Sequence, residues 1–125
     1  MIIKILYIAL GGSIGSILRF LFSNFCKVYF PLFPIGTLAV NVLGSFFIGV
    51  FVSYLNNKEV SEIIVRYFFI IGILGSFTTF SAFSIETINL IESGEILKAG
   101  LNILFSVTLC IAGCWLGMNL SRQIY

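Results

Sequence analysis

The sequence predicts an all-α membrane protein with four transmembrane helices. Of its 125 residues, 59% are hydrophobic and 10% are charged, and the mean hydropathy is +1.13. A soluble domain carries about a quarter charged residues, so these few charges could not cover a surface in water, and the same arithmetic excludes disorder. Because a spanning helix needs about 20 residues, the length fits four spans with short loops in a single four-helix transmembrane domain, residues 1–125.

The first two spans are separated by a turn. The first apolar stretch covers about residues 2–25. Lys4 precedes it, as in a signal peptide, but the stretch runs on through three glycines and no A-x-A-like cleavage site follows. Pro31 and Pro34 are a turn signal, and the second stretch then covers about residues 35–55.

The third and fourth spans follow a polar segment at 56–62. The third stretch, about 63–91, is long for one span and has a polar, glycine-rich middle. A short loop at 92–95 contains Gly94, a turn former, and the fourth stretch covers about residues 96–120.

The distribution of basic residues leaves the orientation in the membrane open. Four spans place both chain ends on one side, and orientation follows the Lys/Arg bias of short loops. That bias is weak here, which fits a weakly encoded single orientation as well as dual topology, in which copies insert both ways and pair antiparallel. The terminus side holds Lys4, Lys58, Arg66 and Arg122, and the other side holds Lys27 and Lys98, with Arg19 near its edge.

Small or polar residues recur every four positions in three of the spans, so they share helix faces. Close helix packing explains the glycines. It explains Asn41 and Asn102 poorly, because an unpaired amide in hydrocarbon is costly; such residues mark either interhelical hydrogen bonds or a polar pathway. The stripes are Gly11, Gly15, Arg19 and Ser23; Thr37, Asn41, Ser45 and Gly49; and Asn102, Ser106, Cys110 and Cys114.

The densest polar signal is the middle of the third span, residues 72–84. Two glycines, two threonines and three serines stand there among three phenylalanines. Gly, Ser and Thr weaken a helix, so the run predicts either a broken helix with an ion site or a kinked helix with back-bonded hydroxyls. Phe80 and Phe83 lie three apart, and either pack or offer positive ring edges to an anion.

Composition limits the chemistry. The chain has no His and no Asp, so no nucleophile–base pair can be built and we expect no enzyme. The three cysteines are expected to be buried thiols rather than disulfides, and a net charge of +2 does not indicate nucleic-acid binding. A small multidrug exporter would need an acid in the first span, and residues 1–24 have none. A packing scaffold would leave Asn41 and the polar run unexplained.

The residues resemble a known family. The run Gly75-Ser-Phe-Thr-Thr-Phe-Ser-Ala-Phe-Ser84 is similar to the third-helix signature of the Fluc (CrcB) fluoride channels. The family pattern is also matched in the first two spans, by Gly11-Gly12, by Arg19-Phe20 and by the segment Gly36-Thr37-Leu-Ala-Val-Asn41. The resemblance covers essentially the whole chain.

This resemblance implies an antiparallel, dual-topology homodimer in the bacterial cytoplasmic (inner) membrane. Two pores along the subunit interface would export fluoride passively and protect the cell from fluoride accumulated as HF. The broken third helices would cross at the dimer centre and hold one structural sodium ion (Na+) through the backbone carbonyls of Gly75 and Thr78. The implied pore residues are Asn41, Phe80, Phe83, Thr37, Thr79, Ser81, Asn102, Ser106 and Cys110, and Arg19 is implied in the vestibule.

Some positions depart from the family or keep an open role. Cysteine is a weak hydrogen-bond donor, so the fourth-helix track is expected to weaken toward Cys110 and Cys114. Leu74 and Ser76 replace smaller residues within the third-helix signature. Glu86 matches the acid after the signature, and three roles stay open for it: a direct role at the site, an ion pair with Arg19 or a nearby lysine, and a solvated helix end.

Overall fold

The computed structural model describes residues 1–57 and 62–124, and the regular secondary structure of these residues is entirely helical. Lys58 and most of the polar segment after the second span lie outside the described residues. In chain order the elements are α1 (Ile2–Tyr29), α2 (Ile35–Asn57), the π-helix η1 (Ile64–Leu74), α3 (Gly75–Phe77), α4 (Phe80–Glu92) and α5 (Ile96–Ile124).

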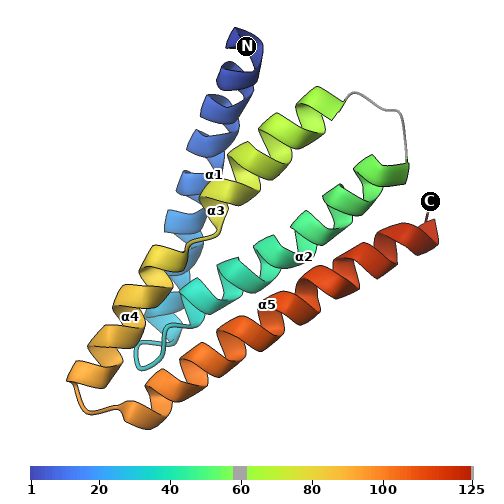
Figure 1. Ribbon diagram of the computed structural model, residues 1–125. Helices are drawn as coiled ribbons and strands as arrows, with labels where there is room; N and C mark the ends of the chain where they lie inside the picture. The colour runs from blue at the N-terminus through green and yellow to red at the C-terminus, as the bar shows by residue number, and fades with distance from the viewer. Residues whose placement is uncertain (58–61, 125) are drawn as a thin grey trace.

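Four helices are long and apolar enough to cross a bilayer, which confirms the predicted all-α membrane class. Three of them are α1, α2 and α5, and the third span, Ile64–Glu92, is composed of η1, α3 and α4. The α1–α2 and α4–α5 connections lie at one end of the molecule (Figure 1).

The first and last helices are longer than the apolar stretches that predicted them. α1 continues to Tyr29 rather than to about residue 25, and α5 to Ile124 rather than to about residue 120. Hydropathy marks only the part of a helix that suits hydrocarbon, whereas backbone hydrogen bonding continues until a residue stops it. In α1 that residue is Phe30, which precedes Pro31 and has left the helical region, as the residue before a proline tends to do.

α2 and α5 run side by side along their length (Figure 1). A Cβ added at Gly49 would meet the backbone carbonyl oxygen of Cys114, and one added at Gly117 would meet that of Phe46. The helix backbones therefore touch at these glycines, as expected for close packing in a membrane. This contact makes α2 and α5 a pair against which the third span is placed.

α1 packs in the same way against the first half of the third span. A Cβ at Gly11 would lie 3.0 Å from Gly72 Cα, and one at Gly15 would meet the carbonyl oxygen of Ile73. The predicted packing role of these α1 glycines is thus confirmed. The contact fixes the end of η1 and the short helix α3 against α1, at the point where regular structure stops.

The third span is not one continuous helix. α3 ends at Phe77 and α4 begins at Phe80, and the link between them is visible in Figure 1. Thr78 (φ −79°, ψ 155°) and Thr79 (φ −153°, ψ 118°) are extended. We call these two residues the break. An extended pair inside a span leaves backbone groups that other residues must satisfy.

Candidate functional site

The break is held by the side chain of Asn41 on α2. Asn41 Nδ2 donates to the Thr79 carbonyl oxygen at 3.0 Å, and the Thr79 N–H donates to Asn41 Oδ1 at 2.7 Å. A buried backbone group without a partner costs about 1–3 kcal/mol. Asn41 satisfies both backbone groups of Thr79, which explains why an amide stands at this position of an apolar helix.

The threonine hydroxyls close the two helix ends that the break creates. Thr79 Oγ1 accepts from the Ala82 N–H at 3.2 Å and so caps the start of α4, as an N-cap threonine does. Thr79 Oγ1 also lies 3.2 Å from Ser81 Oγ. On the other side, Thr78 Oγ1 donates to the Leu74 carbonyl oxygen at 3.0 Å. The Thr79 hydroxyl therefore replaces a helical hydrogen bond at the start of α4, whereas the Thr78 hydroxyl adds to the one that the Thr78 N–H makes with the same carbonyl, at 3.0 Å.

These bonds change the surroundings of two backbone carbonyls. In an uninterrupted α-helix the Thr79 N–H would donate to the Gly75 carbonyl, and the Ala82 N–H would donate to the Thr78 carbonyl. Here the two N–H groups donate to Asn41 Oδ1 and to Thr79 Oγ1 instead. Gly75 and Thr78 therefore lose their helical donors, and they are the two residues whose carbonyls the sequence resemblance assigned to sodium.

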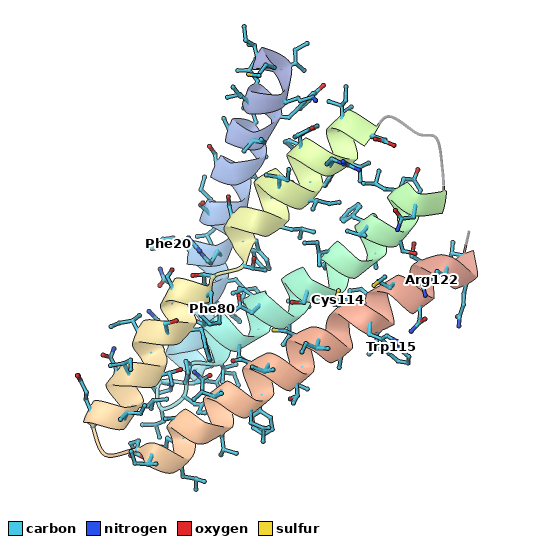
Figure 2. The ribbon with its side chains drawn as sticks, viewed as in Figure 1. Phe20, Phe80, Cys114, Trp115 and Arg122 are labelled. Atoms are coloured by element: carbon cyan, nitrogen blue, oxygen red, sulfur yellow. The ribbon has the colours of Figure 1, made fainter. Side chains whose placement is uncertain are left out.

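A hollow of about 410 Å³ opens on one side of the break. We call it the first hollow. Phe80 and Phe83 line it with ring centroids 5.1 Å apart, and they differ in exposure, 76% for Phe80 and 8% for Phe83. Phe80 stands where α4 begins (Figure 2). The other predicted pore residues on its wall are Asn41, Thr79, Ser106 and Cys110.

A second hollow, of about 560 Å³, lies toward the α1–α2 connection. Its wall carries two cations, Arg19 and Lys27, and one carboxylate, Glu86, among hydroxyl and amide groups. The predicted site residues on it are Arg19, Thr37, Thr79 and Ser81. Thr79 borders both hollows, so the two hollows lie on either side of the break. Sequence reasoning placed Lys27 near this face but gave it no role at the site.

Glu86 faces the second hollow but is not held by a cation. Thr37 Oγ1 donates to Glu86 Oε1 at 2.7 Å, and Glu86 Oε2 is buried without a partner among the described residues. Among the described residues, the ion pair with nitrogen and oxygen within 4.0 Å joins Lys98 and Glu95, at 3.2 Å, so Glu86 forms none. Of the roles left open for Glu86, the ion pair is therefore not the one that the structure has; the hydroxyl of Thr37 on α2 bonds the carboxylate instead.

Asn102 lies away from both hollows. Its Nδ2 donates to Thr87 Oγ1 at 2.9 Å, and that hydroxyl donates to the Phe83 carbonyl oxygen at 2.7 Å. Asn102 is 2% exposed. Of the two readings left open for Asn102, the structure has the interhelical hydrogen bond. Thr87 was missed in the sequence, although it lies one helical turn after Phe83.

The cysteines and the far part of α5 are also placed. Cys110 lies on the wall of the first hollow, whereas Cys114 packs its backbone against Gly49 and is found further along α5 (Figure 2). All three cysteines, including the buried Cys26, are free thiols. The expectation of buried thiols is confirmed for Cys26, whereas Cys110 and Cys114 are only partly buried in this chain.

The fold and site define a small integral membrane protein whose polar groups gather at a break in the third of four spans. A family model described as CrcB-like protein, Camphor Resistance (CrcB), matches residues 6–118. The chain belongs to this family. Together with the four spanning helices, this makes it a multi-pass protein of the bacterial inner membrane.

Curated relatives match nearly the full chain. A protein of Coxiella burnetii is 45% identical over 123 residues, which are 97% of this chain and 99% of the relative. A protein of Campylobacter jejuni is 46% identical over 118 residues, or 94% and 96%. One of Aliivibrio salmonicida is 44% identical over 118 residues, or 94% of both chains. Each of these relatives is named Fluoride-specific ion channel FluC.

Proposed function

We propose that the chain is a fluoride-selective channel that lets fluoride leave the cell passively and so confers fluoride resistance. The full-length similarity to proteins named as fluoride channels supports this. The observation that carries it in the structure is that two hollows with polar groups on their walls share Thr79 as a lining residue. Transport of an ion down its gradient needs a continuous route of weak binding groups and no catalytic chemistry.

The two hollows suit successive steps of anion passage. Fluoride holds its water strongly, so a selective pore must replace that shell with close donors. The cations of the second hollow, Arg19 and Lys27, would raise the local anion concentration. The first hollow offers neutral groups such as the Ser106 hydroxyl and the ring edges of Phe80 and Phe83. Neutral groups bind an anion weakly enough for it to leave.

A second copy of the chain completes the pore in this proposal. The first hollow is open on one side, and the Phe80 ring beside it is 76% exposed. Four helices cannot enclose a pore alone, and a partner inserted in the opposite orientation would cover the open side. The weak Lys/Arg bias is compatible with such dual topology. By symmetry, an antiparallel homodimer then has two pores along its interface.

The break fits a structural sodium ion at the dimer centre. Backbone carbonyl oxygens are suitable ligands for an alkali cation. The carbonyls of Gly75 and Thr78 have lost their helical donors to the side chains of Asn41 and Thr79. Two such carbonyls from each subunit would give the ion four oxygen ligands. When bound, sodium would supply a positive charge that ties the two third spans together.

The test of the function is fluoride release from liposomes. The purified protein is reconstituted into liposomes that contain potassium fluoride. The membrane is then made permeable to potassium, so that no opposing voltage builds up, and external fluoride is followed with an electrode. We expect rapid fluoride release, and no comparable chloride release from matched liposomes loaded with potassium chloride. Protein-free liposomes are the control. Absence of fluoride release, or equally fast chloride release, would contradict the proposal.

A further inference from the structure

Arg19 brings a positive charge to the break. It lies one turn after Gly15, on the α1 face that packs against η1. Arg19 Nη1 donates to the Thr78 carbonyl oxygen at 3.4 Å, in a part-buried setting. Within the described residues, no carboxylate lies within 4.0 Å of this guanidinium. No contact ion pair among the described residues therefore neutralises its charge, although Glu86 lines the same hollow at a longer distance.

The Thr78 carbonyl is also one of the two proposed sodium ligands. A carbonyl oxygen has two lone pairs, so it can accept from Arg19 and still face a cation. The guanidinium and the sodium ion would then share one oxygen and stand a few ångströms apart. Like charges at such a distance repel strongly in a partly buried site. Arg19 therefore weakens sodium binding, and the repulsion is doubled in a homodimer.

The same guanidinium lines the second hollow, where fluoride would collect. An anion beside Arg19 partly neutralises the charge that repels sodium. Two ligands that act on one shared group are linked, and each raises the affinity of the other by the same factor. Lys27 lines the same hollow but, within the described part of the chain, donates no hydrogen bond to the Thr78 carbonyl.

We propose that Arg19 couples the anion in the second hollow to the sodium site: it lowers sodium affinity through the Thr78 carbonyl, and fluoride beside it restores that affinity. This inference rests on the sodium site of the proposed function. It assigns Arg19 a positioning role at the break as well as a place in the vestibule.

The experiment is a sodium titration of the purified, detergent-solubilised protein. Sodium chloride replaces choline chloride at constant ionic strength, and the thermal midpoint and the dimer fraction are read at each step. We expect Arg19→Gln, which removes the charge, to lower the half-saturating sodium concentration about tenfold or more. We also expect millimolar fluoride to lower it several-fold in the wild type and not in Arg19→Gln.

Two further variants separate coupling from a merely structural role. Arg19→Lys keeps the charge and should stay within about threefold of the wild-type sodium midpoint. Lys27→Gln removes a charge from the same hollow and should stay within about twofold. If Arg19→Gln does not fold, Arg19→Met takes its place with the same expectation.

The outcomes distinguish this inference from the function itself. An unchanged or higher sodium midpoint in the charge-removing variants overturns the coupling. A wild type that does not respond to sodium overturns both the sodium site and the coupling, and the liposome assay then decides fluoride transport on its own. An equal fluoride effect in wild type and Arg19→Gln overturns the part assigned to Arg19.

Discussion

The side-chain amide of Asn41 pairs with both backbone groups of Thr79, at 3.0 and 2.7 Å. An asparagine amide carries two N–H donors. One is committed to the Thr79 carbonyl, so only the other is available to an ion. Asn41 therefore supports the break with one N–H and its carbonyl oxygen, and only its second N–H can contact fluoride. Some polar groups of the site thus hold the break, and others face the hollows.

Asn41→Ala is expected to destabilise the protein and to stop conduction. It leaves the N–H and C=O of Thr79 without partners, each at a cost of about 1–3 kcal/mol. We expect a loss of about 2–4 kcal/mol in unfolding free energy, measured in detergent, and at least tenfold slower fluoride release. Ser45 lines the same hollow one turn further along α2, and Ser45→Ala is the control, with a change below about 0.5 kcal/mol. Equal stability of the two variants would contradict the support role.

Thr79→Val tests the cap at the start of α4. Valine has a similar shape but cannot accept from the Ala82 N–H, which Thr79 Oγ1 now does at 3.2 Å. Losing an N-cap costs about 1 kcal/mol, and because Thr79 borders both hollows we expect slower fluoride release as well. Thr79→Ser keeps the hydroxyl and should retain most of both properties. If valine conducts as fast as threonine, the hydroxyl is not part of the route.

Phe80→Ile and Phe83→Ile should both slow fluoride release about tenfold, because isoleucine has no positive ring edge. Their stabilities should differ. Phe83 is 8% exposed and its replacement should cost about 1–2 kcal/mol, whereas Phe80 is 76% exposed within one chain. Crosslinking should show that both variants remain dimeric. Phe105, an exposed residue of α5, provides the control as Phe105→Ile. Unchanged flux in both test variants would remove the ring-edge role.

Asn102→Ala should affect stability more than conduction. Asn102 joins α5 to α4 through the Thr87 hydroxyl, and it lies outside both hollows. We expect a loss of about 1–2 kcal/mol and a change in fluoride release below about threefold. The variant Thr87→Val should cost a similar amount, and the double variant should cost less than the sum, because the two residues share one bond. A tenfold loss of flux in Asn102→Ala alone would contradict this purely structural role and support the pore role predicted from the resemblance.

The outline of the fold was predictable because it depends on local composition. Apolar stretches mark the spans, and the cluster of Gly, Ser and Thr at 72–84 marks the place where the third span is interrupted. The partners of polar groups were not predictable, because they come from other helices. Nothing near Glu86 in the sequence indicates that the Thr37 hydroxyl, 49 positions earlier, donates a hydrogen bond to its carboxylate. Likewise, only the packing shows that Asn102 donates a hydrogen bond to Thr87. Ser106 and Cys110, on the same helix, line the first hollow instead.

Gly117→Ala tests whether the α2–α5 contact sets the geometry of the site. A Cβ there would meet the backbone carbonyl oxygen of Phe46, and backbone cannot move aside as a side-chain tip can. Overpacking of this kind costs about 1–3 kcal/mol and would push α2, with Asn41, away from its place beside the break. Gly100 on the same helix has open space around it, so Gly100→Ala should be neutral or stabilising by up to about 1 kcal/mol. Thermal unfolding and fluoride release of the two alanine variants should therefore separate, with losses confined to Gly117→Ala. If both behave like the wild type, the α2–α5 contact is looser than the structure has it, and the position of Asn41 must depend on α1 and the third span.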